Sequence, residues 1–174
     1  MTKAKNSQGK PAKRRWIIYA GIGFLFGVFD FFYQELMQGL TTATFIRDIL
    51  IFGIWLVPAV PIILSEAWSS NSRWKAVLAC MFTWIAAVVS YYLYMGVALA
   101  FFSLATRPEL HVSNSAAPEF WLNWQSVFIY DVLGGMLEWA PLAVVGGFIV
   151  GWVVSTVYLA WKKRRGEKGL KRLV

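Results

Sequence analysis

The sequence predicts an all-α integral membrane protein with four transmembrane helices. Three observations predict it: 58% of the 174 residues are hydrophobic, only 15% are charged, and the apolar residues gather in four long segments. Soluble domains are about 45–50% apolar and about 25% charged. A chain of this composition is therefore expected to fold with lipid as its solvent.

The four expected helices cover residues 16–37, 49–68, 74–103 and 136–161. Each is long enough, at about 1.5 Å per residue, to cross a hydrocarbon core of about 30 Å. The third is longer than a perpendicular crossing requires, so we expect it to tilt or to protrude. The first follows a basic stretch, as the apolar part of a signal peptide does, but no small-residue cleavage site comes after it. We therefore expect it to remain as an anchor.

A further helix, over residues 118–133, is predicted to lie at the membrane interface. Its polar residues recur at helical spacing among aromatic and aliphatic residues, which is typical of an amphipathic helix. Pro118 suits the first turn of such a helix, and Gly134 and Gly135 are expected to end it before the last span. A re-entrant helix that dips into the bundle is the alternative.

The charges predict the domain limits and the orientation. Residues 1–15 and 162–174 are basic tails on a single transmembrane domain, residues 16–161. With both tails in the cytoplasm, that side holds fifteen lysines and arginines against two on the other, which is the positive-inside pattern. We therefore expect a multi-pass protein of the plasma (inner) membrane with both termini cytoplasmic. A bacterial source is expected, and the lack of an N-x-S/T sequon is compatible with it.

The placement of the basic residues also predicts the partners. Basic clusters beside membrane spans attract anionic lipid headgroups, so the bilayer is the expected partner and nucleic acid is not. Two G-x-x-x-G pairs, Gly23 with Gly27 and Gly147 with Gly151, allow helix backbones to approach closely. We expect the first and last spans to pack on each other through these glycines. Assembly with a second copy of the chain or with another membrane protein is the alternative.

Two features of the second span predict local structure. Pro58 and Pro61 each lack a backbone N–H, so we expect a kink near the middle of the membrane. Glu66 lies near the cytoplasmic end of the same span. We expect it to pair with Arg73 or Lys75 across the short link to the third span.

Asp30 is the strongest candidate for a functional residue. It lies within "GVFDFFYQELM", in the outer third of the first span, where an acid costs about 2.5–3.5 kcal/mol to insert. Such a residue is expected to face a cavity, the bundle interior or a hydrogen-bonding partner. Tyr33, Tyr91, Tyr94 and Glu138 lie at comparable depth, so we expect them to form an outer-leaflet polar pocket with Asp30. A purely structural helix-to-helix hydrogen bond is the alternative for Asp30.

The function classes that remain are few. The chain has no H-E-x-x-H, paired C-x-x-C, G-x-S-x-G or P-loop motif, so neither an enzyme nor a cofactor or metal is indicated. Most of the ten tryptophans are expected in interfacial belts, which leaves little reason to expect a ligand cage. We favour a non-catalytic membrane subunit or scaffold, because four spans make a tight bundle with little room for a solute. A small transporter or a solute- or cation-binding protein with its pocket at Asp30 is the alternative.

Overall fold

The computed structural model describes residues 9–39, 44–101 and 119–170, and almost all of these residues are helical. The elements, in chain order, are α1 (Gly9–Gly39), α2 (Thr44–Gly53), α3 (Leu56–Ser70), α4 (Arg73–Phe101), α5 (Phe120–Val127), the π-helical turn η1 (Phe128–Leu133) and α6 (Gly134–Leu170). No strand occurs within these three ranges. The predicted all-α fold class is confirmed.

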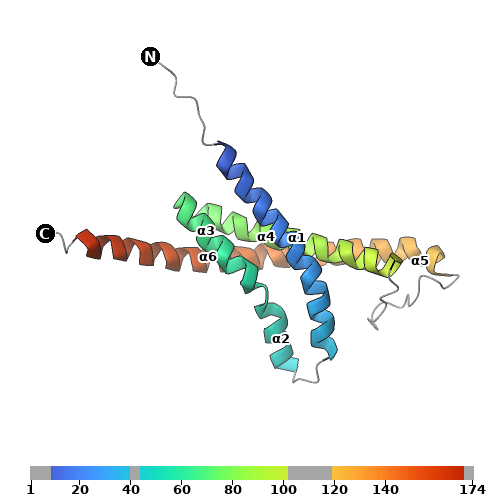
Figure 1. Cartoon of the computed structure of the whole chain (residues 1–174). Coiled ribbons are helices and arrows are strands. Elements are labelled where there is room, and N and C mark those ends of the chain that lie inside the picture. Colours follow the sequence, from blue (N-terminus) through green and yellow to red (C-terminus); the bar gives the residue numbers. More distant parts are fainter. Residues whose placement is uncertain (1–8, 40–43, 102–118, 171–174) are drawn as a thin grey trace, which may run out of the picture.

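The described residues contain four helical segments that are long and apolar enough to cross a membrane. The segments are Lys13–Met37, Thr44–Ser70, Arg73–Phe101 and Phe120–Arg165. Each contains or largely overlaps one of the four predicted spans. The start of α1, the end of α6 and the link between α3 and α4 lie toward the same side of the molecule, so the segments alternate in direction (Figure 1).

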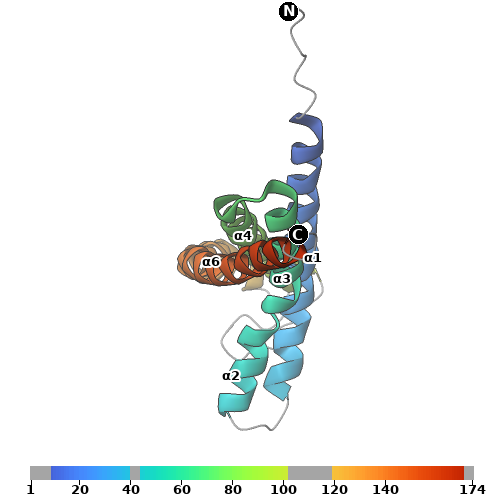
Figure 2. The same ribbon diagram turned by 90° about the vertical axis from the view of Figure 1, so that its left-hand side faces the viewer.

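The helix α4 forms the centre of the fold. It lies antiparallel beside α6, while α1 crosses it steeply and α3 packs against both α4 and α6 (Figures 1 and 2). In the most apolar stretch of α4, 56% of the residues are buried, against at most 28% in the other three segments. The helix α2 lies beside the second half of α1, and its Thr44 end points away from the α4–α6 pair. It contributes no buried residue.

The glycines of α1 explain its close approach to α4. A Cβ atom on Gly27 would collide with the carbonyl oxygen of Ala87 and the hydroxyl oxygen of Ser90, and one on Gly23 would collide with the carbonyl oxygen of Thr83. At the same crossing, the Ser90 hydroxyl donates a hydrogen bond of 2.9 Å to the carbonyl of Phe24 on α1. The first G-x-x-x-G pair therefore packs on α4.

The second glycine pair also packs on α4, but through a different part of it. A Cβ atom on Gly147 would lie 3.0 Å from Met81 Cα, and one on Gly151 would lie 2.9 Å from Val77 Cα. Among the described residues, no Cα atom of α1 lies within 8 Å of a Cα atom of α6. The expectation that the first and last spans pack on each other is wrong. The reason is that α4 lies between the two spans, so the glycines of each span pack on α4 instead.

The second span is broken at Ile54 and Trp55, between α2 and α3. Pro58 has no N–H to donate to the carbonyl of Ile54, which instead accepts a tighter bond of 3.0 Å from the N–H of Val57. Pro58 itself lies in the first turn of α3, where a missing N–H is tolerated. Pro61 lies inside α3 without interrupting it. The change of direction is therefore on the outer side of Pro58, under the predicted orientation.

The helix predicted over residues 118–133 is present as α5 and η1, but Gly134 and Gly135 do not end it. The π-helical turn passes directly into α6, so the chain stays helical from Phe120 to Leu170. Gly135 serves a different purpose, because a Cβ atom there would collide with the ring of Tyr92 on α4. Gly135 thus makes room for an aromatic ring and does not stop the helix.

Glu66 is fully buried, and its partners differ from those that we expected. Its Oε2 lies 3.2 Å from Arg15 Nε, and it accepts a hydrogen bond of 3.1 Å from the Tyr19 hydroxyl. The predicted pairing with Arg73 or Lys75 is wrong, and both of those residues are exposed. The crossing of α1 over α3 brings Arg15 to Glu66 from 51 positions away in the sequence.

Candidate functional site

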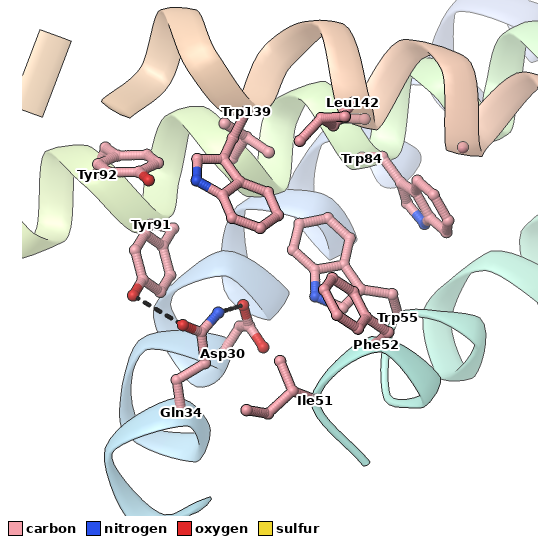
Figure 3. A pocket seen from close by; sticks show the side chains of 13 residues that line it. Asp30, Gln34, Ile51, Phe52, Trp55, Trp84, Tyr91, Tyr92, Trp139 and Leu142 are labelled. Atoms are coloured by element: carbon pink, nitrogen blue, oxygen red, sulfur yellow. Dashed lines mark hydrogen bonds between the residues drawn. The ribbon is translucent and has the colours of Figure 1, made fainter. Parts of the chain in front are cut away.

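A cavity of about 650 Å³ lies between α1, the α2–α3 break, α4 and α6 (Figure 3). The space exists because α1 and α2 diverge from the α4–α6 pair instead of running alongside it. The described residues that line the cavity are Asp30, Gln34, Ile51, Phe52, Trp55, Trp84, Val88, Tyr91, Tyr92, Trp139, Leu142, Ala143 and Gly146. The expectation of a tight bundle with little room for a solute is therefore not met.

Asp30 is placed in the cavity wall by the same face of α1 that carries the packing glycines. Gly23, Gly27, Asp30 and Gln34 follow one another at spacings of four, three and four residues, so they share one face of the helix. Gly23 and Gly27 fix that face against α4. The next residues on this face, Asp30 and Gln34, lie beyond the crossing of α1 and α4, at the edge of the cavity.

A short hydrogen-bonded chain joins α1 to α4 at this point. The side-chain amide of Gln34 donates to Asp30 Oδ2 at 2.8 Å, and the Tyr91 hydroxyl donates to Gln34 Oε1 at 3.2 Å. Asp30 is 0% exposed. Figure 3 shows that the second carboxyl oxygen of Asp30 lies on the side of Ile51. Gln34 thus orients the carboxyl group, and Tyr91 orients Gln34.

Aromatic rings make up most of the remaining wall. They pack in three pairs, with ring centroids 6.5 Å apart for Phe52 and Trp139, 5.5 Å for Trp55 and Trp84, and 5.1 Å for Tyr91 and Tyr92. The pairs hold their rings by mutual contact, at separations typical of favourable aromatic packing. Gly146 makes room for one of them, since a Cβ atom there would lie 2.7 Å from Trp84 Cζ3.

The cavity reaches the surface of the protein between α2 and α6. Phe52 on α2 is 59% exposed and Leu142 on α6 is 55% exposed, although both line the cavity. Trp139 lies beside them and is also partly exposed. This mouth is apolar, whereas Asp30 and Gln34 lie on the α1 side of the cavity.

The structure brings two of the five predicted pocket residues together. Asp30 and Tyr91 line the cavity. Tyr33 instead donates to the carbonyl of Leu50 at 3.3 Å, and the ring of Tyr94 packs on that of Phe31. Glu138 is exposed. None of these last three is among the described lining residues.

Sequence reasoning missed most of the aromatic wall. Three of the ten tryptophans, Trp55, Trp84 and Trp139, line the cavity, which leaves seven for the expected interfacial belts. A helical spacing argument would have found Gln34, because it follows Asp30 by four residues on the same helix face.

The polar part of the described lining is small. It offers one carboxyl group, one side-chain amide, the tyrosine hydroxyls and a set of aromatic rings. Within the described ranges, no group of three or more histidine, cysteine or acidic residues could hold a metal ion. Comparison of the chain with protein-family models, curated proteins and solved structures gave no match.

Proposed function

We propose that this chain is a solute-binding membrane protein, of the kind found among small transporters, that holds its ligand in the cavity at Asp30. One observation carries the proposal: a fully buried carboxyl group, oriented by Gln34 and Tyr91, borders a cavity of about 650 Å³ that opens between two helices. Ligand pockets are typically about 300–1,000 Å³, mostly apolar, with a few placed polar groups. The cavity has each of these properties.

The proposed setting is the plasma membrane of a bacterium, with both termini in the cytoplasm. The fifteen-to-two distribution of basic residues supports this orientation. It puts the Arg15–Glu66 pair on the cytoplasmic side and the cavity toward the outer leaflet. The basic tails would then lie against anionic headgroups of the inner leaflet.

The proposal can be tested by comparing two cysteine variants on one helix. Ile51 lines the cavity, whereas Ile49 is 54% exposed and is not among the lining residues. Ile51→Cys and Ile49→Cys would each be treated, in lipid vesicles, with a neutral water-soluble thiosulfonate that reacts with thiols. Position 49 lies nearer the outer end of α2, so depth alone would make it the faster to react.

A cavity that admits solutes reverses that order. We expect Ile51→Cys to react faster than Ile49→Cys, because only the first thiol meets water and solute inside the protein. The unsubstituted protein gives the background, since its one cysteine, Cys80, is buried. If Ile51→Cys reacts no faster than Ile49→Cys, the cavity does not admit solutes and the proposal fails.

A non-catalytic membrane subunit is the second candidate, and one observation favours it. The segment Thr44–Ser70 has only 17% of its most apolar stretch buried, so most residues of that stretch are at least partly exposed to lipid or to a partner helix. In that case the α2–α3 segment would be the surface that contacts the partner. Cross-linking from an exposed α3 position such as Val57 to a second protein would support it.

A further inference from the structure

The mouth of the cavity lies within the part of the protein that spans the membrane. Phe52 and Leu142, which border it, belong to two of the segments that are long and apolar enough for a crossing. Under the proposed orientation, Trp161 is at the cytoplasmic end of the last span. Leu142 precedes it by nineteen residues, about 28 Å along a helix, which is within a hydrocarbon core about 30 Å thick. The mouth therefore faces the chains of outer-leaflet lipids.

Two acids support this depth from independent helices. Asp48 on α2 and Glu138 on α6 are both exposed. Each precedes the mouth residue of its own helix, Phe52 or Leu142, by four positions, about 6 Å. Exposed acids of this kind belong at the interface, since an acid is costly among lipid chains. The mouth is thus about one helical turn below the outer interface on both sides.

Two aromatic rings bridge the gap between α2 and α6 at the mouth. Among the described residues, no Cα atom of α2 lies within 8 Å of a Cα atom of α6. The rings of Phe52 and Trp139 meet across the gap, with centroids 6.5 Å apart and planes at 26°. Both residues are exposed, and α2 contributes no buried residue. Passage between the two helices therefore requires side chains to move but breaks no close backbone packing.

The surface that a ligand meets inside is apolar. Asp30, the one acid among the described lining residues, is 0% exposed, and these residues include no lysine, arginine or histidine. The side-chain amide of Gln34 is engaged on both sides, with its nitrogen bonded to Asp30 and its oxygen to Tyr91. Rings and aliphatic side chains make up most of the remaining lining (Figure 3). A charged ligand would lose its hydration against such a surface, which favours an uncharged one.

We propose that the cavity takes up an uncharged lipophilic molecule that is dissolved in the outer leaflet, and that the molecule enters sideways through the mouth between α2 and α6. Inside, it packs on the rings of Trp55, Trp84 and Trp139, which suit a ligand with a ring of its own. This inference rests on the proposed function. It deepens that function by naming the chemical class of the ligand and the side from which it enters.

The test compares two thiol reagents on Ile51→Cys in lipid vesicles. Benzyl methanethiosulfonate is neutral and lipophilic, whereas trimethylammonioethyl methanethiosulfonate carries a permanent charge and stays in water. Each rate is divided by the rate of the same reagent with glutathione, so that intrinsic reactivity cancels. We expect the neutral reagent to be at least about tenfold faster on this scale, because a charge does not readily pass through a lipid-facing mouth. Equal rates, or a faster cation, would show entry from water and overturn the inference.

A larger side chain in the mouth tests the route itself. Leu142→Trp places a ring there, and Leu137→Trp makes the same change at an exposed position of α6 that is not among the described lining residues. In the Ile51→Cys background, we expect Leu142→Trp to slow labelling by the benzyl reagent severalfold and Leu137→Trp to leave it unchanged. Both positions are exposed, so both variants are expected to fold. Equal rates in the two variants would contradict passage between α2 and α6.

Protection of the Ile51→Cys thiol measures binding inside the cavity. Acetylnaphthalene is neutral and naphthalenesulfonate is charged, and their concentrations are compared as those present in the membrane. We expect the neutral compound to slow labelling at a concentration at least about tenfold lower. Trp139→Leu should weaken this protection severalfold. Trp152→Leu should not, since Trp152 lies on the same helix but packs on Trp74 and Phe148 away from the cavity.

The two proposals fail in different ways. If Ile51→Cys reacts no faster than Ile49→Cys with the small neutral reagent, the cavity is closed and both proposals fail. If it reacts faster but the charged reagent is equally fast, or Leu142→Trp has no effect, the proposed function stands and the sideways route is overturned. Lipid chains are present in large excess throughout. Lack of protection by acetylnaphthalene would therefore also follow if a lipid chain filled the cavity, and would overturn a free molecule as the ligand.

Discussion

Arg15 Nε lies 3.2 Å from Glu66 Oε2, and this pair joins the first turns of the α1 span to α3. The Glu66 side chain is almost completely buried, whereas the Arg15 side chain is 32% exposed. Tyr19 donates a further hydrogen bond to the same carboxyl group at 3.1 Å. The contact is important because α1 and α3 otherwise meet over a short length.

Loss of Arg15 should destabilise the protein. In Arg15→Ala, Glu66 stays buried without its cation, so we expect the free energy of unfolding to fall by about 3 kcal/mol. This is the low end for a broken buried ion pair, because the Arg15 side chain is partly exposed. Unfolding in detergent micelles measures it. Lys13→Ala, at an exposed position of the same turn, is the control. The double variant Arg15→Ala with Glu66→Gln should recover part of the loss, and equal stability of Arg15→Ala and Lys13→Ala would contradict the pairing.

The packing of α1 on α4 predicts that two glycines of one helix respond differently to the same change. Gly27→Ala puts a methyl group against the Ala87 carbonyl and the Ser90 hydroxyl, and overpacking of this kind costs about 1–3 kcal/mol. Gly21→Ala meets nothing within 4 Å and should leave stability unchanged or slightly raised. The midpoint of thermal unfolding in detergent, measured for both variants and for the unsubstituted protein, tests this prediction. Equal effects of the two substitutions would show that α1 does not approach α4 at Gly27.

Restoring a backbone N–H at Pro58 should straighten the second span. In Pro58→Ala the new N–H can donate to the carbonyl of Ile54, so α2 and α3 can join into one helix. A straight helix holds positions 50 and 65 about 22 Å apart at 1.5 Å per residue. Spin labels at these positions, with Cys80 replaced by Ala, should report a longer distance in Pro58→Ala than in the parent. Pro61→Ala should leave the distance unchanged, and an unchanged distance in both would locate the cause elsewhere.

The orientation predicts opposite locations for two reporters. A fusion at His111, which lies outside the described residues, should report the outer side of the membrane, and a fusion after the C-terminus should report the cytoplasm. The basis is the excess of basic residues on the tail side. Enzymatic reporters active on only one side of the membrane make the measurement. Activity of both on the same side would contradict a four-span arrangement.

The sequence was informative where the physical cause is local. The four spans follow from the length of each apolar run, and the burial of Asp30 follows from the cost of an acid at its depth. The break before Pro58 follows from a single missing donor. These features require no knowledge of which helices are neighbours.

The features that could not be predicted depend on helix crossing. Gly27 indicates close approach to a helix but does not say which one, and nothing in the sequence indicates that Gly135 faces the ring of Tyr92. Glu66 and Arg15 meet only because α1 passes over α3. Trp84 and Trp139 resemble ordinary membrane tryptophans until the angle between α1 and the α4–α6 pair leaves a cavity beside them.

The central position of α4 has a consequence for biosynthesis. Ribosomes deliver the chain from the N-terminus, so α1 and the α2–α3 segment enter the membrane before the helix on which they pack. Until residues 73–101 emerge, Asp30 and the glycine face of α1 have only lipid and the second span beside them. The Arg15–Glu66 pair is available from the moment α3 is made, so it can hold the first two spans together during that interval.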